Sequence, residues 1–208
     1  PTPINEIYQS TREITESTLD FDETDIFDVE QGIDGQSQGV ALPIVEKLEQ
    51  LVQETQSDAA ELSEALQIQI VRGELEIESE GRRIVVRIKE RGSFAPGTAD
   101  LAPDYFAVIA IIREVIAKRE GAVAVEGHTD DINIRSNRFR SNWDLSAMRA
   151  VSVAQELFID NLLDSRRFAV TGFADTQPLV PNDSTQNRGR NRRVEIVIRQ
   201  AIDPTLQE

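Results

Sequence analysis

The sequence predicts an α/β fold, an α+β two-layer sandwich in which helices pack on one face of a mixed β-sheet. Two observations support this prediction. Segments in which apolar and polar residues alternate, as in half-buried strands, recur along residues 75–199. Segments with apolar residues three or four positions apart, as in amphipathic helices, separate them. Strands that alternate with helices are typical of a sheet covered by a helical layer.

We expect residues 1–40 to form a flexible acidic tether. Residues 1–80 hold 20 of the 37 acidic residues and three of the 22 basic ones. The stretch from Asp20 to Gly39 is also rich in Gly, Ser and Gln, so it repels itself and buries too little apolar area to offset its ordering entropy. A chain with a formal net charge of -15 would meet phosphates against its own field, which excludes nucleic acid as a partner.

Residues 41–70 are predicted to form an amphipathic linker helix. Pro43 suits a first helical turn, and the apolar residues after it recur at helical spacing as far as Leu66. The polar face is acidic, which argues against a helix that lies on a membrane surface. We expect the apolar stripe to pack on the following domain or on a second copy of the chain.

Residues 71–202 carry the predicted sandwich, and residues 203–208 form a short tail. Alternating apolar residues on both sides of Glu80-Gly81 predict a β-hairpin. The longest apolar run, 106–112, is too short to cross a bilayer. The remaining elements are expected in the order helix, strand, helix, strand and strand, at 101–118, 122–127, 142–163, 168–173 and 193–199.

The only histidine, His128, directly follows a predicted strand, where sites commonly form in open α/β sheets. A metal site would need more ligands than this histidine and the two acids beside it. A hydrolase would need a nucleophile, but the chain has no cysteine and no Gly-x-Ser-x-Gly elbow. We therefore expect no catalytic residue, no metal and no cofactor.

Asp130 and Arg149 are the candidates for ligand binding. Asn142 and Arg149 are seven residues apart, which places them on nearly the same face of a helix. If the polar loop at 128–141 folds back, Asp130 and Arg149 flank one cleft. The carboxylate would then bind the ammonium of a zwitterion and the guanidinium its carboxylate. A structural salt bridge between the two residues is an equally open alternative.

Four ordered motifs resemble the OmpA-like peptidoglycan-binding domain over about residues 75–200. They are Gly127-His128-Thr129-Asp130, Leu145-Ser146-x-x-Arg149-Ala150, Gly172-Phe173-Ala174-Asp175-x-x-Pro178 and Asn191-Arg192-Arg193-Val194-Glu195-Ile196. The resemblance implies that Asp130 binds the amine of diaminopimelate in the peptidoglycan stem peptide, and that Arg149 binds a carboxylate. The further residues that it implies at or near the site are Thr129, Asn142, Leu145, Arg192 and Arg193.

Structural roles remain open for several of these residues. Asn142 can instead cap a helix, and Leu145 can belong to the core alone. The pair Arg192-Arg193 can form a solvated basic end. We expect the ring of His128 to donate to backbone and so position its loop, and Trp143 to pack at the edge of the core.

A narrower resemblance lies within the first. Ser141-Asn142-Trp143-Asp144-Leu145-Ser146 and the enlarged loop before it are similar to flagellar stator proteins of the MotB/PomB type. Pro1-Thr2-Pro3-Ile4 and the acidic tether look most like the sodium-driven PomB form. The resemblance implies the periplasmic region of a single-pass inner-membrane protein that anchors an ion-conducting stator to the cell wall.

The stator resemblance also implies partners. These are peptidoglycan, a PomA/MotA-type subunit bound through a membrane helix ahead of Pro1, and a second copy in a homodimer. Other flagellar basal-body ring proteins are further candidates. The chain begins at Pro1 and its only methionine is Met148, so we expect a piece of a longer translation product.

Two alternative functions stay open. One is a general cell-wall anchor of the OmpA or peptidoglycan-associated lipoprotein kind, and the other is a cell-wall amidase. The enlarged loop before Asn142 favours the stator.

Overall fold

The computed structural model describes residues 38–201, with side chains from residue 46 onward. The predicted tail and the predicted tether as far as residue 37 lie outside the described residues. The chain divides into two compact units, residues 1–50 and 51–208. Helix α3 (Gln38–Ala65) begins in the first unit and ends in the second. All other elements below belong to the second unit.

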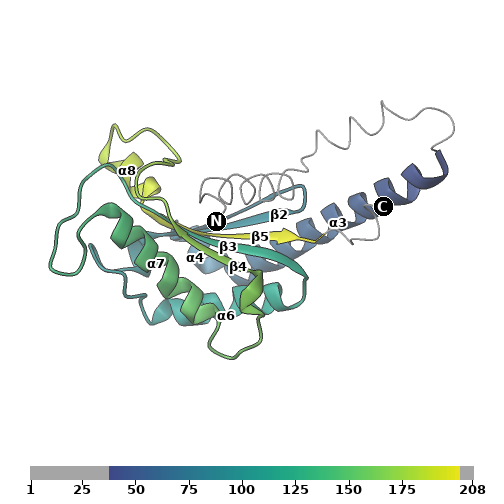
Figure 1. The fold of residues 1–208 in the computed structure, drawn as a ribbon, viewed down its shortest axis with the longest axis horizontal. Coiled ribbons are helices and arrows are strands. Elements are labelled where there is room, and N and C mark those ends of the chain that lie inside the picture. The colour runs from purple at the N-terminus through teal and green to yellow at the C-terminus, as the bar shows by residue number, and fades with distance from the viewer. Residues whose placement is uncertain (1–37, 202–208) are drawn as a thin grey trace, which may run out of the picture. The chain divides into compact units, whose positions relative to one another are not determined.

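The second unit is built on one five-stranded sheet with the order β1-β2-β5-β3-β4. Strands β3 and β4 are parallel, and every other neighbouring pair is antiparallel. Helices α6 and α7 cover one side of this sheet (Figure 1), so the predicted mixed two-layer architecture is confirmed. The strands are β1 (Leu75–Glu80), β2 (Arg83–Lys89), β3 (Gly121–His128), β4 (Phe168–Gly172) and β5 (Arg193–Gln200).

The predicted hairpin is confirmed as strands β1 and β2. Glu80 pairs with Arg83, so Gly81 and Arg82 form the turn. Gly81 has φ +52°, in the left-handed region that glycine adopts without a steric penalty. Gly81 therefore allows the tight two-residue turn of this hairpin.

The three long helices predicted from the sequence are present as α3, α6 and α7, but some of their ends differ from the predicted ones. Helix α7 ends at Leu157, six residues before the predicted end at Leu163. Asn161, in the turn that follows, has φ +52°, and a right-handed helix cannot continue through a residue with positive φ. Three short helical elements were not predicted, because a segment of three to seven residues shows no helical period. Besides α3, the helices are α4 (Gln67–Val71), α5 (Glu90–Ser93), α6 (Asp104–Ala117), α7 (Asn142–Leu157), the 3-10 turn η1 (Ser165–Arg167) and α8 (Thr185–Asn191).

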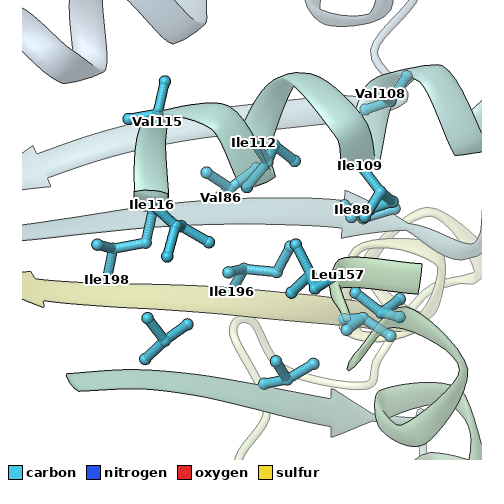
Figure 2. Close-up of a cluster of buried hydrophobic side chains, with 14 of the residues drawn as sticks. Val86, Ile88, Val108, Ile109, Ile112, Val115, Ile116, Leu157, Ile196 and Ile198 are labelled. Atoms are coloured by element: carbon cyan, nitrogen blue, oxygen red, sulfur yellow. The ribbon is translucent and has the colours of Figure 1, made fainter. Parts of the chain in front are cut away.

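The main core lies between the sheet and its helices. Ile109, Ile112 and Ile116 of α6 are fully buried above branched residues of β2 and β5 such as Val86 and Ile196 (Figure 2). Branched side chains on a strand alternate faces, so one row of each strand enters this layer. The arrangement leaves the ends of the strands free to carry polar groups.

The C-terminal part of α3 contributes to the same core. Leu62 of α3 and Leu66, the residue directly after α3, are fully buried there, which confirms that this part of the apolar stripe packs on the domain. Val52, about three helical turns before Leu62, is only partly buried. Among residues 38–201, no helix is both long enough and apolar enough to cross a bilayer.

Candidate functional site

Three strand ends meet at one edge of the sheet. β5 pairs antiparallel with both β2 and β3, and its first residue, Arg193, lies opposite Lys89 and His128. The residues just beyond these strand ends are therefore brought together, although they are far apart in the sequence. They include Glu90 after β2 and Asp130 after β3.

Four charged side chains form an alternating ion-pair cluster at this edge. Arg192 Nη1 donates to Asp130 Oδ2 at 2.5 Å, and Arg192 Nε donates to Glu90 Oε2. Glu90 Oε1 accepts from Arg149 Nη2 at 2.5 Å. We call Asp130, Arg192, Glu90 and Arg149 the ion-pair cluster. The structure thus brings Asp130 and Arg149 into one cluster, and in the described residues no direct salt bridge joins them.

Arg149 is the most deeply buried member of the cluster. It comes from the middle of α7, and its side chain is 1% exposed. Its Nε donates to Thr98 O at 2.8 Å, and its guanidinium carbon lies 5.2 Å from the centre of the Phe94 ring. Nη1 is buried and has no hydrogen-bond partner among the described residues. Arg149 therefore keeps one unused donor group inside the site.

Arg192 is the most exposed member, with 32% of its side chain accessible. Burial alone would lower the pKa of Arg192, but the carboxylates of Asp130 and Glu90 outweigh that effect and raise it. The guanidinium is therefore a fixed positive charge that links the two acids.

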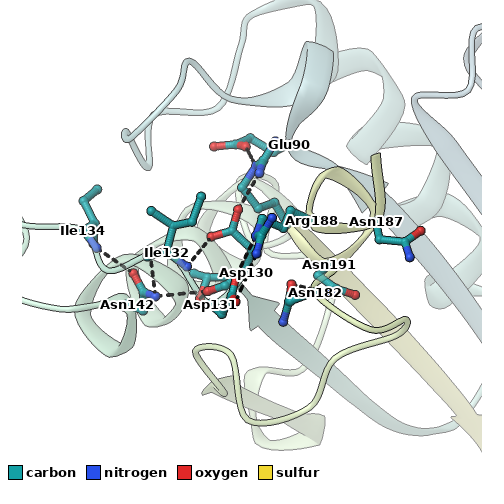
Figure 3. Close-up of polar contacts among 12 residues, drawn as sticks. Glu90, Asp130, Asp131, Ile132, Ile134, Asn142, Asn182, Asn187, Arg188 and Asn191 are labelled. Carbon is teal, nitrogen blue, oxygen red and sulfur yellow. Dashed lines mark hydrogen bonds and ion pairs between the residues drawn. The ribbon is translucent and has the colours of Figure 1, made fainter. Parts of the chain in front are cut away.

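Asn142 holds the loop that carries Asp130. Its Nδ2 donates to Asp130 O and to Ile132 O, both at 3.1 Å, and its Oδ1 accepts from Ile134 N at 3.0 Å (Figure 3). The predicted alternative of a helix cap is wrong, because Ser141 caps α7 by accepting from Asp144 N at 3.3 Å. Asn142 instead fixes three backbone groups of the loop.

Thr129 and Leu145 support the same loop through a hydrogen bond and through packing. Thr129 is buried, its amide donates to Ala174 O at 2.8 Å and its hydroxyl donates to Asp130 O at 3.0 Å. Leu145 is buried with Ala99 and Phe139 in a second, smaller apolar cluster. Both residues shape the position of Asp130 through packing and backbone contacts.

Arg193 does not join the ion-pair cluster. Its Nε donates to Glu195 Oε1 at 2.5 Å, and it also bonds the carbonyls of Asn191 and Gln177. Strand alternation places Arg193 and Glu195 on the sheet face opposite the core residue Val194. The alternative of a solvated basic end is also wrong for Arg193, which is 6% exposed.

The roles expected for His128 and Trp143 are corrected. Both ring nitrogens of His128 are buried without a hydrogen-bond partner among the described residues, so the ring does not donate to backbone. It stacks instead on Phe173, with ring centres 5.3 Å apart. Trp143 is 53% exposed and does not pack in the core, because it projects from the first turn of α7.

Sequence reasoning missed Glu90. This residue links the two arginines of the cluster, yet it stands in a short charged segment without a recognisable motif. A signal did exist, because Glu90 directly follows a buried strand, the same position that drew attention to His128. The described part of the chain contains no group of three or more His, Cys, Asp or Glu side chains placed to hold a metal ion.

Comparisons with known proteins identify the family. The model of the OmpA family matches residues 93–192. A solved structure of a putative MotB like protein from Desulfovibrio vulgaris is 31% identical, with a TM-score of 0.66. That alignment covers 74% of this chain and 99% of the other. The chain belongs to the OmpA family.

Two further relatives of this OmpA-family chain are a cell wall anchor and a motility protein. The cell wall anchor of the T6SS from Pseudomonas aeruginosa is 34% identical, with a TM-score of 0.61 over 67% of this chain and 97% of that one. Motility protein B of Bacillus subtilis is 31% identical over 126 residues, which are 60% of this chain and 48% of that protein. The OmpA-family chain spans about half the length of the curated relatives it matches.

Proposed function

We propose that this chain is the peptidoglycan-binding region of a flagellar stator subunit, which anchors an ion-conducting stator to the cell wall so that it can deliver torque. The observation that carries the proposal is the ion-pair cluster, in which Asp130 and Arg149 are held in one buried network. The likeness to motility protein B and to a cell wall anchor supports the same function.

The ligand of the proposed site is the diaminopimelate residue of the peptidoglycan stem peptide. Its free end carries an ammonium and a carboxylate on one carbon. Asp130 would bind the ammonium and Arg149 the carboxylate, each through a charge-assisted hydrogen bond. Thr129, Asn142 and Leu145 act through the loop that they hold, so their contribution is to keep Asp130 in place.

The role proposed for the cluster is binding rather than catalysis. Both carboxylates of the cluster are paired with arginine, which favours their ionised forms and suits the binding of a charged ligand. The buried ring of His128 stacks on Phe173, and its nearest charged partner is Glu126, 3.9 Å from Nε2. A cell-wall amidase is therefore not favoured by the geometry of these residues.

The setting of the whole protein is part of the proposal. The relatives support a periplasmic region of a single-pass inner-membrane protein, with a PomA/MotA-type subunit as its partner in the membrane and a second copy in a homodimer. The proposal of sodium coupling rests on the resemblance of the N-terminal segment to the PomB form. The proposal of contacts with basal-body ring proteins rests on the resemblance to stator proteins.

A second candidate is a general cell-wall anchor in another assembly. The 34% identity with the cell wall anchor of the T6SS favours it, because that protein is an anchor of another assembly. Both candidates use the same wall-binding site. Restoration of swimming in a stator-deficient strain by the full-length protein would support the stator, whereas wall attachment without swimming would support the general anchor.

Co-sedimentation with diaminopimelate-containing sacculi tests the proposed binding. We expect Asp130→Asn and Arg149→Lys to lose sedimentation, because each keeps the size or charge of the native side chain and removes the proposed contact. Asp131→Asn is the matched control, since Asp131 lies beside Asp130 but pairs with Arg188 on the surface. Retained sedimentation in both site variants would reject the site.

A further inference from the structure

Glu90 binds the two guanidinium groups, of Arg149 and Arg192, that a ligand carboxylate would bind. One of its oxygens accepts from Arg149 Nη2 at 2.5 Å, and the other accepts from Arg192 Nε. The Glu90 side chain is 12% exposed, so this contact is shielded from water. A carboxylate of the protein itself therefore lies between the two guanidinium groups.

A ligand carboxylate at Arg149 would meet Glu90 on the same guanidinium. Arg149 Nε donates to Thr98 O and Nη2 donates to Glu90, so Nη1 is the one nitrogen of this guanidinium without a partner among the described residues. A carboxylate bound through both Nη1 and Nη2 would share Nη2 with Glu90 and bring two negative charges together, which favours the release of Nη2 by Glu90.

The backbone of Glu90 is held, so only its side chain can move aside. Its amide donates to Arg192 O at 3.0 Å, and its carbonyl accepts from Phe94 N at 3.0 Å. The residue after next, Gly92, has φ +99°, so the chain turns away directly behind it. A change of rotamer is thus the natural way for the Glu90 carboxylate to leave Arg149.

We infer that Glu90 is a built-in competitor that the ligand carboxylate must displace from Arg149, and that it thereby sets the affinity and selectivity of the site. This inference rests on the proposed function. A ligand with only an ammonium binds at Asp130 and leaves Glu90 where it is. A ligand that also carries a carboxylate displaces Glu90 and gains the contact with Arg149. Glu90 lies outside the segment matched by the family, residues 93–192.

Glu90→Gln tests the inference, because it removes the charge and keeps the size of the side chain. Calorimetric titration with a soluble stem tripeptide ending in meso-diaminopimelate should give binding about tenfold tighter than wild type, which corresponds to about 1.4 kcal/mol. The same tripeptide with lysine in that position keeps the ammonium at the end of the side chain and lacks the carboxylate beside it. Its affinity should be unchanged or weaker, since the site becomes more positive.

Glu76→Gln is the matched control. Glu76 pairs with Lys89, one residue before Glu90, at 2.5 Å. Among the described residues, no hydrogen bond or ion pair joins Glu76 to the cluster arginines. We expect wild-type affinity for both tripeptides. If Glu90→Gln does not fold, Glu90→Asp retains the charge, draws it back by one methylene, and should give a smaller gain for the diaminopimelate tripeptide alone.

The outcomes separate the two proposals. Wild-type binding of the diaminopimelate tripeptide, together with equal or weaker binding by Glu90→Gln, would overturn the competitor role and make Glu90 a residue that orients Arg149. An equal gain for both tripeptides would also overturn it, because the effect would not depend on the ligand carboxylate. If neither wild type nor variant binds diaminopimelate, the proposed function fails and the inference with it.

Discussion

The guanidinium of Arg119 binds both carboxylate oxygens of Asp58, from Nε at 2.8 Å and from Nη2 at 3.0 Å. Asp58 lies on α3 and is almost fully buried, whereas Arg119 follows the end of α6. Gln200 Nε2, at the end of β5, reaches the same carboxylate at 3.5 Å. The C-terminal part of the linker helix is therefore joined to the domain by a buried polar contact as well as by Leu62 and Leu66.

Loss of Arg119 should weaken the domain much more than loss of its neighbour. Arg119→Met removes both short hydrogen bonds to the buried Asp58 carboxylate and leaves the long contact from Gln200, so we expect it to lower the free energy of unfolding by about 2–3 kcal/mol. Lys118→Met removes a pair with Glu61 in which both side chains are half exposed, so about 0.5 kcal/mol or less is expected. Urea unfolding of both variants measures the difference, and equal losses would contradict it.

Arg149 should matter for folding as well as for binding. Its side chain is 1% exposed, so Arg149→Ala leaves a cavity and removes one of the two arginines that hold Glu90. We expect a loss of about 3–5 kcal/mol in the free energy of unfolding, in contrast to the small effect of a surface charge. Thermal or urea unfolding checks this, with the exposed Arg140→Ala as control. A melting temperature close to wild type would show that the site tolerates an empty position.

The stability contributed by Glu195 should depend on pH. Burial would raise the pKa of Glu195, but hydrogen bonding to Arg193 and the charges of Arg193 and Arg87 outweigh it and lower the pKa below its usual value of 4.5. A carboxyl with a lowered folded-state pKa stabilises the fold above its unfolded pKa, and the contribution is lost as pH falls through the folded value.

Glu195→Gln should therefore cost about 2 kcal/mol at pH 7 and less at pH 3, because the stabilisation by the ionised carboxylate declines once the pH falls below the unfolded-state pKa. Urea unfolding of wild type and variant at the two pH values gives the comparison. A gap that is the same at pH 3 and pH 7 would rule out the ionised pair as its source.

Gly127 should be needed for the approach of α7 to the sheet. A Cβ at Gly127 would lie 2.0 Å from Ser146 O, a contact with backbone that no side-chain movement relieves. Gly127→Ala must shift the first turns of α7, and we expect it to cost about 3 kcal/mol and to weaken sacculus binding. Gly189→Ala in α8 meets only Arg192 Nη2, at 3.8 Å, and should be neutral or slightly stabilising. Similar melting temperatures for the two variants would disprove the steric argument.

The layers of the fold could be read from the sequence because they follow from periodic apolar residues. The hairpin at Gly81 and the buried faces of β5 and α6 are of this kind. The end of α7 could not be placed, since Leu163 continues the apolar pattern and is buried, yet it reaches the core from a turn. Apolar spacing alone does not show where a backbone leaves a helix.

The site was predictable only in part for a different reason. Asp130 and Arg149 stand in recognisable motifs, but their partners depend on which strand ends meet. Arg192 and Arg193 are adjacent in sequence, and strand alternation sends only the first into the ion-pair cluster. Glu90 needed the antiparallel pairing of β2 with β5, a relationship between segments about a hundred residues apart.

The positions of Asp58 and of the ion-pair cluster have a mechanical consequence. Asp58 contacts Arg119, just before β3 begins, and Gln200, where β5 ends, while the cluster lies where β3 ends and β5 begins. A pull between α3 and a bound wall would thus run along β3 and β5, across hydrogen bonds that lie perpendicular to the strands over eight residue pairs. A force that enters through Arg119 before β3 and leaves through Arg192 before β5 acts on opposite ends of the two antiparallel strands, so all these bonds share it in shear. If both strands were instead pulled apart from one end, the same hydrogen bonds would break one after another, each under the full load.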